Sequence, residues 1–296
     1  MPVSKLIDTL RAFTCRFDSL VRLCERHAIS SDSTHSLTVV SNIDMDCIPG
    51  WQKLDLKRCQ GARYFSDGLE YCWLHDFDIP LVIKSESVHE IDIQNVYGFS
   101  ASKSLLSNFK TTDAMIHQPN SRGMVSTISD EALQEALSWH EIRILNSPNG
   151  GGDHLCNFEY LDRYFLANSG GSHHFAAAKY IAKKLDKRVI LKARTLSYRI
   201  NPLAVEELEK KYRGVLITAE ELPAFEMREQ LQKRRVRYFH LSFNQCGWIS
   251  NWHLFLYPKD SLLSEKAHHA MKKSGGIDLM SVLHQLLNVQ SNKKEE

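Results

Sequence analysis

The chain has 296 residues, of which 43% are hydrophobic and 24% are charged, and its formal net charge is +2. This composition is typical of a soluble globular protein, long enough for one large domain or two smaller ones, each with its own core. The near balance of charge excludes a global electrostatic attraction to nucleic acid or to an anionic membrane. Local basic patches are still compatible with a net charge of this size.

The N-terminal segment lacks the apolar core of a signal peptide, because Lys5, Asp8 and Arg11 interrupt it. No window approaches the roughly eighteen apolar residues that a membrane-spanning helix needs. The cysteines number seven and are scattered along the chain, which favours reduced thiols over a disulfide framework. We therefore expect a cytoplasmic protein without a membrane partner.

The first third of the chain predicts one helix followed by short strands. Residues 4–27 have helically spaced apolar positions with basic residues between them. Between residues 37 and 99, β-branched and aromatic runs alternate with Asp, Gly and Pro breaks, as in strands. The runs are LTVVSNI, ARYF, YCWLH, PLVIKSE and HEIDIQNVYGF. Residues 102–126 are mixed and polar, and this pattern gives no assignment.

The rest of the chain alternates predicted helices and strands. Ser129 and Asp130 are plausible N-caps of a helix over residues 129–139. In chain order there follow a strand EIRIL, the break NSPNGGGDH, a strand DRYFLANSGG, a helix SHHFAAAKYIAKKL, a strand KRVILKARTLS, a helix NPLAVEELEKKYR, a basic helix AFEMREQLQKRRVR, the strands YFHLSFN and NWHLFLYP, and an apolar helix GGIDLMSVLHQLLNVQ.

The junction at residues 168–174 carries the main functional signal. A strand that ends in glycines before a helix leaves unpaired N–H groups at the positive end of the helix dipole, where phosphates bind. Gly170 and Gly171 permit positive φ and a close approach of ligand. Ser172 can cap the helix or donate to phosphate, and His173 and His174 can donate when protonated or act as acid and base.

The alternative reading of this junction is a glycine turn capped by Ser172, with two half-exposed histidines. It is not a Walker loop, because no Gly-Lys-Ser/Thr follows the glycines, and the spacing of a dinucleotide fingerprint is also missing. A Ser-His hydrolase pair is disfavoured, since adjacent residues on a helix point in different directions.

The segment DRYFLANSGGSHHFAAAKYIAKKL resembles the central element of the ParB/sulfiredoxin-like fold. In that family a strand runs into Gly-Glu-Arg-Arg, or into Gly-Gly-Cys-His-Arg in sulfiredoxins, and then into an alanine-rich helix. Residues 171–174 fall on those positions, and Ala176 and Ala177 fall on the small residues that follow. The flanking helix, strand and later strand agree in order, so the resemblance covers roughly residues 125–215.

The resemblance implies a nucleotide or phosphate pocket at the start of this helix, since members bind ATP or CTP there. Some members transfer or hydrolyse phosphate or cut nucleic acid. The residues implied to bind the ligand are Asn168, Ser169, Gly170, Gly171 and Ser172, and those implied in catalysis are Ser172, His173 and His174. Ser172 stands at the reactive cysteine of sulfiredoxins, so sulfinate reduction is not expected. His174 replaces an arginine, which predicts weaker or pH-dependent triphosphate binding.

Four further sets of residues are candidate sites. Asp153 or Glu159, beside the glycine-rich loop, would hold magnesium if that loop faces the pocket; the alternative is a flexible hairpin. Cys47, Cys59, Cys72 and His75 lack the close spacing of zinc sites, so no zinc is expected. The basic run at residues 233–237 lies beside aromatic strands and is either a phosphate-backbone contact or, more commonly, a solvated helix end. His240 and His253 either face a pocket or, in the favoured interpretation, are satisfied core residues.

We therefore predict a mixed α/β (α+β) protein with a mainly β extension over residues 1–120 and a ParB/sulfiredoxin-like domain over residues 121–296. One functional hypothesis is a nucleotide- or phosphate-dependent phosphotransferase, NTPase or phosphodiester hydrolase that uses ATP or CTP with magnesium. The other is a non-catalytic module that binds a protein or nucleic-acid partner, such as a bacterial or phage accessory factor. The sequence does not decide between enzyme and module.

Overall fold

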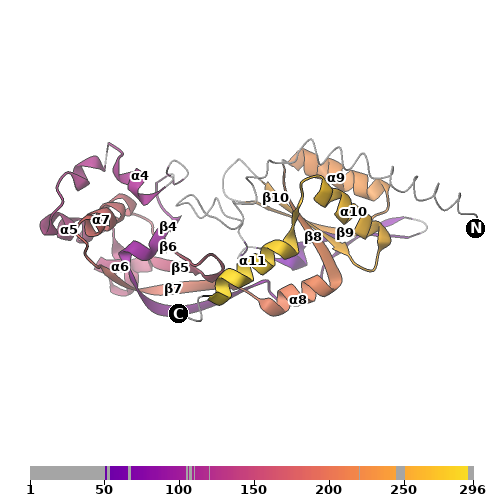
Figure 1. The fold of residues 1–296 in the computed structure, drawn as a ribbon, viewed down its shortest axis with the longest axis horizontal. Coiled ribbons are helices and arrows are strands. Elements are labelled where there is room, and N and C mark those ends of the chain that lie inside the picture. Colours follow the sequence, from indigo (N-terminus) through magenta and orange to yellow (C-terminus); the bar gives the residue numbers. More distant parts are fainter. Residues whose placement is uncertain are drawn as a thin grey trace, which may run out of the picture. The chain divides into compact units, whose positions relative to one another are not determined.

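The computed structural model describes residues 51, 54–65, 68–104, 106, 109, 111–119, 121–219, 221–244 and 251–292. The helix predicted over residues 4–27 and the strand predicted over residues 37–43 lie outside this part of the chain. The described residues form helices and two β-sheets, which confirms the predicted mixed α/β class (Figure 1).

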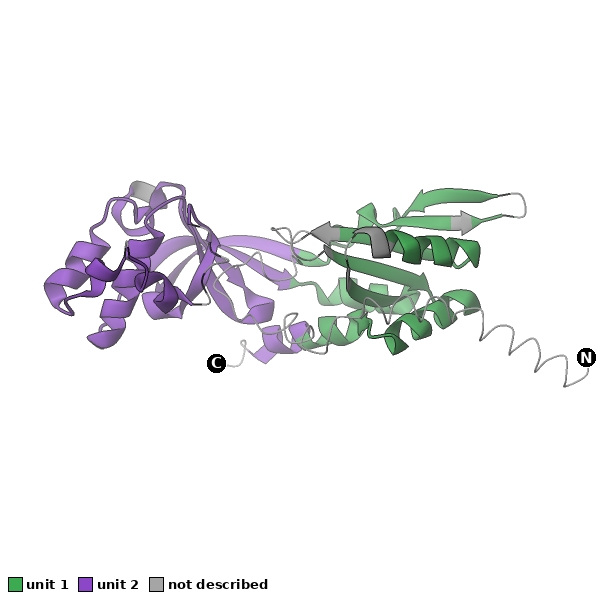
Figure 2. Ribbon diagram, turned by 90° about the horizontal axis from the view of Figure 1, so that it is seen from above, with its two compact units in different colours: residues 1–37, 49–82, 200–285 green, residues 38–48, 83–199, 286–296 purple. Residues whose placement is uncertain are grey.

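The chain divides into two compact units (Figure 2). Among the described residues, unit 1 comprises those up to residue 82 and residues 200–285, and unit 2 comprises residues 83–199 and 286–292. Most of unit 2 is therefore one continuous insertion in the sequence of unit 1. Residue 120, where the sequence analysis divides the chain, falls inside that insertion.

Unit 2 contains a five-stranded sheet in the order β3-β7-β5-β6-β4. Strand β6 pairs antiparallel with β5 and parallel with β4, and β5 pairs parallel with β7. The bounds are β3 (Val82–Asp92), β4 (Val96–Ala101), β5 (His154–Phe158), β6 (Arg163–Ala167) and β7 (Ile190–Ile200). The strands predicted at DRYFLANSGG and KRVILKARTLS are confirmed as β6 and β7. The runs PLVIKSE and HEIDIQNVYGF meet in a single long strand, β3, and the second of them continues through η4 (Ile93–Asn95) into β4.

The prediction of a strand at EIRIL is wrong. This segment contains a short helix, α6 (Arg143–Asn146). Ile144 in this helix and its N-cap residue Ile142 are both buried in the core. Asn146 fixes the end of the helix, because its side-chain amide donates to the carbonyls of Leu137 and Trp139. The neighbour of β6 in the sheet is β5 instead, and it begins directly after the glycine-rich 3-10 helix η7 (Pro148–Gly152).

Helix α7 (Ser172–Lys184) follows β6 and supplies a buried face of small residues, among them Ala176, Ala177 and Ala178. Phe175 in its first turn meets Phe99 of β4 edge to face, with ring centroids 5.8 Å apart. The other helical segments of unit 2 are α4 (Thr112–Ile116), η6 (Arg122–Val125), α5 (Asp130–Leu137) and η8 (Glu159–Leu161). The hydrophobic core of unit 2 lies between these helices and the sheet.

The N-terminus of α5 forms as the sequence predicts. The Ser129 hydroxyl caps it by accepting the backbone N–H of Ala132, and Asp130 and Glu131 lie in the first turn. Acidic residues there interact favourably with the helix dipole. Leu133 and Ala136 form the buried side of this short helix.

Unit 1 contains a six-stranded sheet in the order β11-β8-β10-β9-β1-β2. Its strands are β1 (Gln60–Tyr64), β2 (Leu69–Trp73), β8 (Tyr212–Ala219), β9 (Tyr238–Asn244), β10 (Asn251–Pro258) and β11 (Ile277–Asp278). Its helical segments are η3 (Leu56–Arg58), α8 (Pro202–Lys211), α9 (Glu221–Lys233) and α10 (Leu262–Lys273), and the chain continues into α11 (Leu279–Asn292). The strands predicted at ARYF, YCWLH, YFHLSFN and NWHLFLYP are confirmed, as are the helices predicted at α8, α9 and α11. Strand β8 and helix α10 were not predicted.

Strands β3 and β7 carry the chain into and out of the insertion. Glu86 of β3 pairs with Arg194 of β7 at 2.7 Å, and Glu90 pairs with Lys192 at 3.0 Å. The partners follow one another in opposite directions along the two strands, as in an antiparallel pair. The backbone N–H of Asn201 donates to the carbonyl of Leu81 at 2.9 Å. The residues just before and just after the insertion are therefore hydrogen-bonded to each other.

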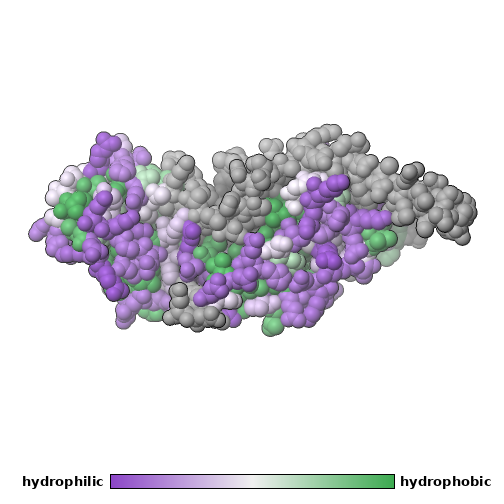
Figure 3. All heavy atoms as spheres, viewed as in Figure 1, coloured by the Kyte–Doolittle hydropathy of each residue, from purple (hydrophilic) through white to green (hydrophobic). Residues whose placement is uncertain are grey.

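The surface drawn in Figure 3 is mostly hydrophilic, with smaller hydrophobic areas between the charged residues. No helix in the described ranges is long and apolar enough to span a membrane.

Candidate functional site

A cavity of about 250 Å³ opens at the start of α7, within unit 2. Residues of the predicted turn line it together with side chains from three other parts of the chain. The lining residues are Lys103, Ser104, Met124, Glu141, Gly170, Gly171, Ser172, His173 and His174. The structure thus brings together a cavity, a helix N-terminus and the glycine, serine and histidine residues of the predicted turn.

Glu141 lies close to both glycines of the turn, and Gly171 is required there by its backbone conformation and by the Glu141 backbone. Gly171 is the N-cap residue of α7 and has a φ of +74°, a conformation that L side chains rarely adopt. A Cβ atom added to it would lie 2.8 Å from the backbone carbon of Glu141. A Cβ atom on Gly170 would lie 2.8 Å from Oε1 of the same glutamate. The segment that carries Glu141 therefore packs directly on the turn.

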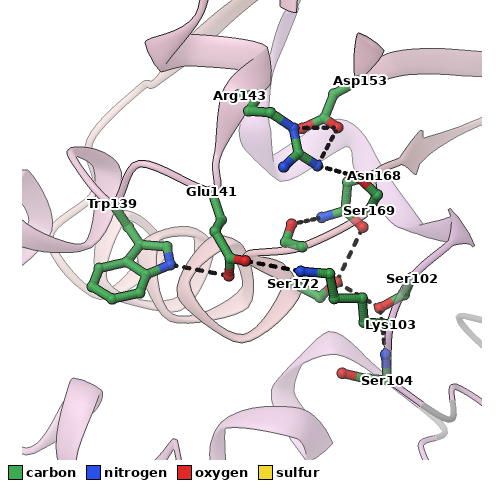
Figure 4. A network of polar contacts seen from close by, with 11 residues as sticks. Ser102, Lys103, Ser104, Trp139, Glu141, Arg143, Asp153, Asn168, Ser169 and Ser172 are labelled. Atoms are coloured by element: carbon green, nitrogen blue, oxygen red, sulfur yellow. Dashed lines mark hydrogen bonds and ion pairs between the residues drawn. The ribbon is translucent and has the colours of Figure 1, made fainter. Parts of the chain in front are cut away.

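A directed chain of hydrogen bonds fixes the end of β6 to the first turn of α7 (Figure 4). The Asn168 amide donates through Nδ2 to the Gly170 carbonyl at 2.7 Å, and its Oδ1 accepts from the Ser172 hydroxyl at 3.1 Å. The oxygen of Ser172 lies 2.6 Å from that of Ser102. Because a hydroxyl has one proton, which Ser172 gives to Asn168, Ser102 donates to Ser172.

This arrangement changes the role expected of Ser172. The side chain is buried, and its proton is committed to Asn168. It cannot donate to a phosphate oxygen without breaking that bond. In the described part of the chain its hydroxyl bonds to Asn168 and Ser102, and no histidine is placed to activate it as a nucleophile. Ser169, another expected ligand contact, accepts instead from the guanidinium of Arg143. The side chains of Asn168, Ser169 and Ser172 hold the turn in shape.

The carboxylate of Glu141 lies at the mouth of the turn, and sequence reasoning missed it. It accepts from the Lys103 ammonium at 3.0 Å and from the Trp139 indole N–H at 3.4 Å (Figure 4). It also accepts from the backbone N–H of Gly171. The bond with Lys103 is the main cause of the lowered pKa of Glu141. The positive end of α7 thus already has an anionic partner from its own chain.

Both histidines of the turn are half-buried. The His174 ring stacks on Trp139 with centroids 4.0 Å apart and planes 4° from parallel. His173 bonds through Nδ1 to the Ser121 hydroxyl and has a further hydrogen bond with the backbone of Met115. Burial lowers the pKa of each, and for His174 the nearby Glu141 carboxylate opposes that shift. Both rings are therefore mainly neutral at pH 7, and Lys103 supplies the positive side-chain charge at the cavity.

The two carboxylates considered for magnesium lie at opposite ends of β5. Asp153 precedes this strand and Glu159 follows it, so their backbones are separated by roughly 20 Å at the rise of a strand. Asp153 is buried and pairs with Arg143 at 3.0 Å, while its Oδ2 has no hydrogen-bond partner in the described chain. A search of the described residues finds no group of three His, Cys, Asp or Glu side chains that could hold a metal ion.

The basic run at the end of α9 is partly neutralised by nearby carboxylates. Lys233 lies 3.7 Å from Glu229, one helical turn earlier, and Arg237 pairs with Asp260 at 2.5 Å. Two of its four charges therefore have carboxylate partners. This supports the interpretation of the run as a solvated helix end.

The comparisons with known proteins place the chain in a family. Residues 86–296 match the model of DUF6685, a family of unknown function. The chain belongs to this family. No curated protein and no solved structure matches this chain. The whole of the cavity at the start of α7 lies within the matched residues.

Proposed function

We propose that this protein binds a phosphate-containing ligand, such as a nucleotide, in the cavity at the start of α7, and that it is a diverged member of the ParB/sulfiredoxin-like fold. The observation that carries the proposal is the position of Gly170, Gly171 and His174 in the wall of that cavity, beside the ammonium group of Lys103. A helix N-terminus with a nearby cation is a favourable place for a phosphate.

The order of elements supports the fold. Helix α5, the β5–β6 hairpin, helix α7 and strand β7 follow one another in the chain, with β6 leading directly into the glycine turn. This is the succession of helix, strand, motif strand, motif helix and strand on which the resemblance rests, with β5 in place of EIRIL. A cytoplasmic location, expected from the sequence, is part of this proposal.

The cavity is small for a whole nucleotide. Its volume of about 250 Å³ falls below the range of about 300–1,000 Å³ that is usual for ligand pockets. The ligand therefore places one phosphate group in the cavity and the rest of its structure outside. Phosphate contacts come from Lys103 and from backbone N–H groups of the first turn of α7.

Binding requires the Glu141 carboxylate to give way, because it occupies the same end of the helix. A bound phosphate also favours protonation of His173 and His174, whose pKa values are lowered in the free protein. Affinity is therefore expected to rise as the pH falls from 8 to 6. If the protein is a phosphotransferase or a phosphodiester hydrolase, His174 is the better candidate for proton transfer, since His173 is held by Ser121.

The test is a thermal-shift titration of the full chain with ATP, CTP, GTP and inorganic phosphate, each with and without magnesium. A ligand of the folded state raises the melting temperature by mass action. Lys103→Met should reduce the shift, whereas Lys183→Met, which removes an exposed lysine near the other end of α7, should leave it unchanged. Absence of any shift for the wild-type protein at millimolar ligand contradicts the proposal. A positive result is followed by assays for phosphate release and transfer.

The contact between Glu141 and Lys103 favours a second candidate function. With this ion pair in place, the turn is closed by its own chain and serves as a structural junction. The protein would then be a non-catalytic module for a protein or nucleic-acid partner. The same titration separates the two functions, because a junction gives no phosphate-dependent shift in either lysine variant or in the wild type.

A further inference from the structure

Unit 1 has a cavity of its own, of about 320 Å³, which the proposed function does not use. It lies among residues of β1, β2, α9 and β9. The lining residues are Gln60, Gly61, Tyr71, Phe225, Arg228, Glu229, Gln232, Tyr238 and His240. Its volume is within the usual range for small-molecule pockets.

The guanidinium of Arg228 is the cation of this cavity. The side chain is partly buried and forms no ion pair with any carboxylate whose side chain the structure describes. Its polar contact is with Nδ1 of His240 at 3.5 Å, and it lies 5.7 Å from the ring centroid of Phe225. A partly buried arginine without a counter-ion is costly, because desolvation disfavours an unpaired charge.

His240 does not compensate this charge. An arginine can only donate, so Nδ1 of His240 accepts and its Nε2–H donates to Nδ1 of His253 at 3.0 Å. Both histidines are buried, as the sequence analysis expected. Burial, with His253 and Arg228 close by, lowers the pKa of His240 to about 3, so the ring is neutral at physiological pH. Arg228 therefore supplies the positive charge of this wall, in which Glu229 is the acidic lining residue.

The cavity wall also contains one carboxylate, that of Glu229, and the aromatic side chains of Tyr71 and Phe225. Glu229 lies 3.7 Å from Lys233, so its carboxylate has a partner of its own. Tyr71 and Phe225 are 59% and 49% exposed, which is high for aromatic residues that line a cavity. Gln232 lies between the hydroxyls of Tyr71 and Tyr238, at 3.5 and 3.3 Å.

We propose that this cavity binds a small planar aromatic ligand that carries an acidic group, either a carboxylate or a phosphate. The acidic group pairs with the guanidinium of Arg228, whose planar fork matches both anions. The aromatic ring packs against Tyr71 and Phe225 and covers their exposed faces. Aromatic acids and nucleoside monophosphates share this chemistry.

The test is calorimetric titration of the full chain at pH 7.5 with 4-hydroxybenzoate and adenosine monophosphate. Inorganic phosphate serves as the acid without a ring, and adenosine as the ring without an acid. We expect at least one of the two ring acids to bind at least ten-fold more tightly than phosphate or adenosine. Arg228→Met should weaken that binding about ten-fold, as expected for loss of a charge-assisted hydrogen bond. Arg228→Lys should retain part of it, and Tyr71→Leu should weaken it.

Lys273→Met is the matched control, because it removes one positive charge from an exposed position in the same unit. It should leave binding unchanged, and circular dichroism should show all variants folded. Failure of both ring acids to bind the wild type overturns the proposal. So does binding that persists undiminished in Arg228→Met, which for adenosine monophosphate would indicate the cavity at α7 instead. Tighter binding of 4-hydroxybenzoate would indicate a carboxylate ligand, and tighter binding of adenosine monophosphate would indicate a phosphate ligand.

Discussion

Asn168 shows how one buried amide determines the geometry of the turn. It bridges the Gly170 carbonyl and the Ser172 hydroxyl, and both bonds depend on its two polar atoms. The sequence predicted this residue as a ligand contact, because it lies in the motif. Its burial and its direction toward the turn could be known only from the fold.

Asn168→Ala is expected to destabilise the protein by about 2 kcal/mol, because two polar groups lose partners. Ser126→Ala removes one exposed hydroxyl with a single bond to a backbone carbonyl, and should cost far less. The free energy of unfolding in urea measures both. Equal effects of the two substitutions would show that the amide does not hold the turn.

The contact of Glu141 and Lys103 with the glycine turn could not be predicted from the sequence. They lie about 30 and 70 residues before the glycines, in segments that resemble ordinary polar surface. No local pattern distinguishes a lysine or glutamate that meets a turn from one in solvent. The fold brings them together, and it makes the glutamate the neighbour of both glycines.

His240 predicts a pH dependence of stability. Its pKa is lowered from 6.5 in the unfolded chain to about 3 in the folded protein, so the unfolded state binds more protons between these values. The stabilisation is complete above about pH 6.5 and is lost as the pH falls toward 3. The expected slope is about 1.4 kcal/mol per pH unit from this residue.

Urea unfolding between pH 5 and 7.5 measures that slope. His240→Gln should reduce it, and exposed His269→Gln is the control for loss of an imidazole. His268, whose pKa is lowered to about 4 mainly by burial, adds to the slope in both variants. An unchanged slope in His240→Gln would contradict the burial of a neutral ring.

At the scale of elements, the sequence predicted those with a clear period and clear ends. Helices α5, α7 and α8 have a cap, a glycine or a proline at their start, and the β9–β10 strands have dense aromatic residues. EIRIL failed because a single turn of helix and a short strand can both bury Ile142 and Ile144. Strand β5 was not predicted, because it directly follows the glycine-rich loop. Neither the sequence of β5 nor that of β6 indicates that the two strands pair.

Helix α7 packs through alanines, and this predicts low tolerance for added volume. Ala177 is fully buried, so Ala177→Leu forces side chains or backbone to shift at a cost of about 1–3 kcal/mol. Lys183→Leu, on the exposed side of the same helix, should change stability by less than about 0.5 kcal/mol. Urea unfolding of the two variants gives the comparison, and an equal cost would mean that this face is loosely packed.

At the scale of the whole molecule, the division into two units was not predictable from composition, because no linker-like segment marks it. The buried residues of the hydrophobic cluster between the sheet and the helices of unit 2 all fall between Ile91 and Ala193. Among the described residues, this cluster therefore lies within the insertion, while Leu286, buried in α11, is also assigned to unit 2. Unit 1, in contrast, is assembled from segments on both sides of the insertion.

Residues 83–199 are accordingly expected to fold as an isolated fragment, with a cooperative thermal transition and dispersed amide signals in NMR spectra. A fragment of residues 83–167 lacks α7 and should not fold, because that helix contributes buried residues from Phe175 to Ala182. Disorder in the longer fragment would show that unit 2 depends on the rest of the chain.

The ribbon formed by β3 and β7 has a consequence for how this chain can be rebuilt. The Leu81 carbonyl and the Asn201 N–H are hydrogen-bonded. If the insertion were deleted, a tight turn could therefore join these two residues and keep the chain of unit 1 continuous. The same position would accept a foreign domain whose two ends lie about 5 Å apart, the spacing of paired strands. The molecule thus has an internal graft point, and the two cavities can be studied in separate chains.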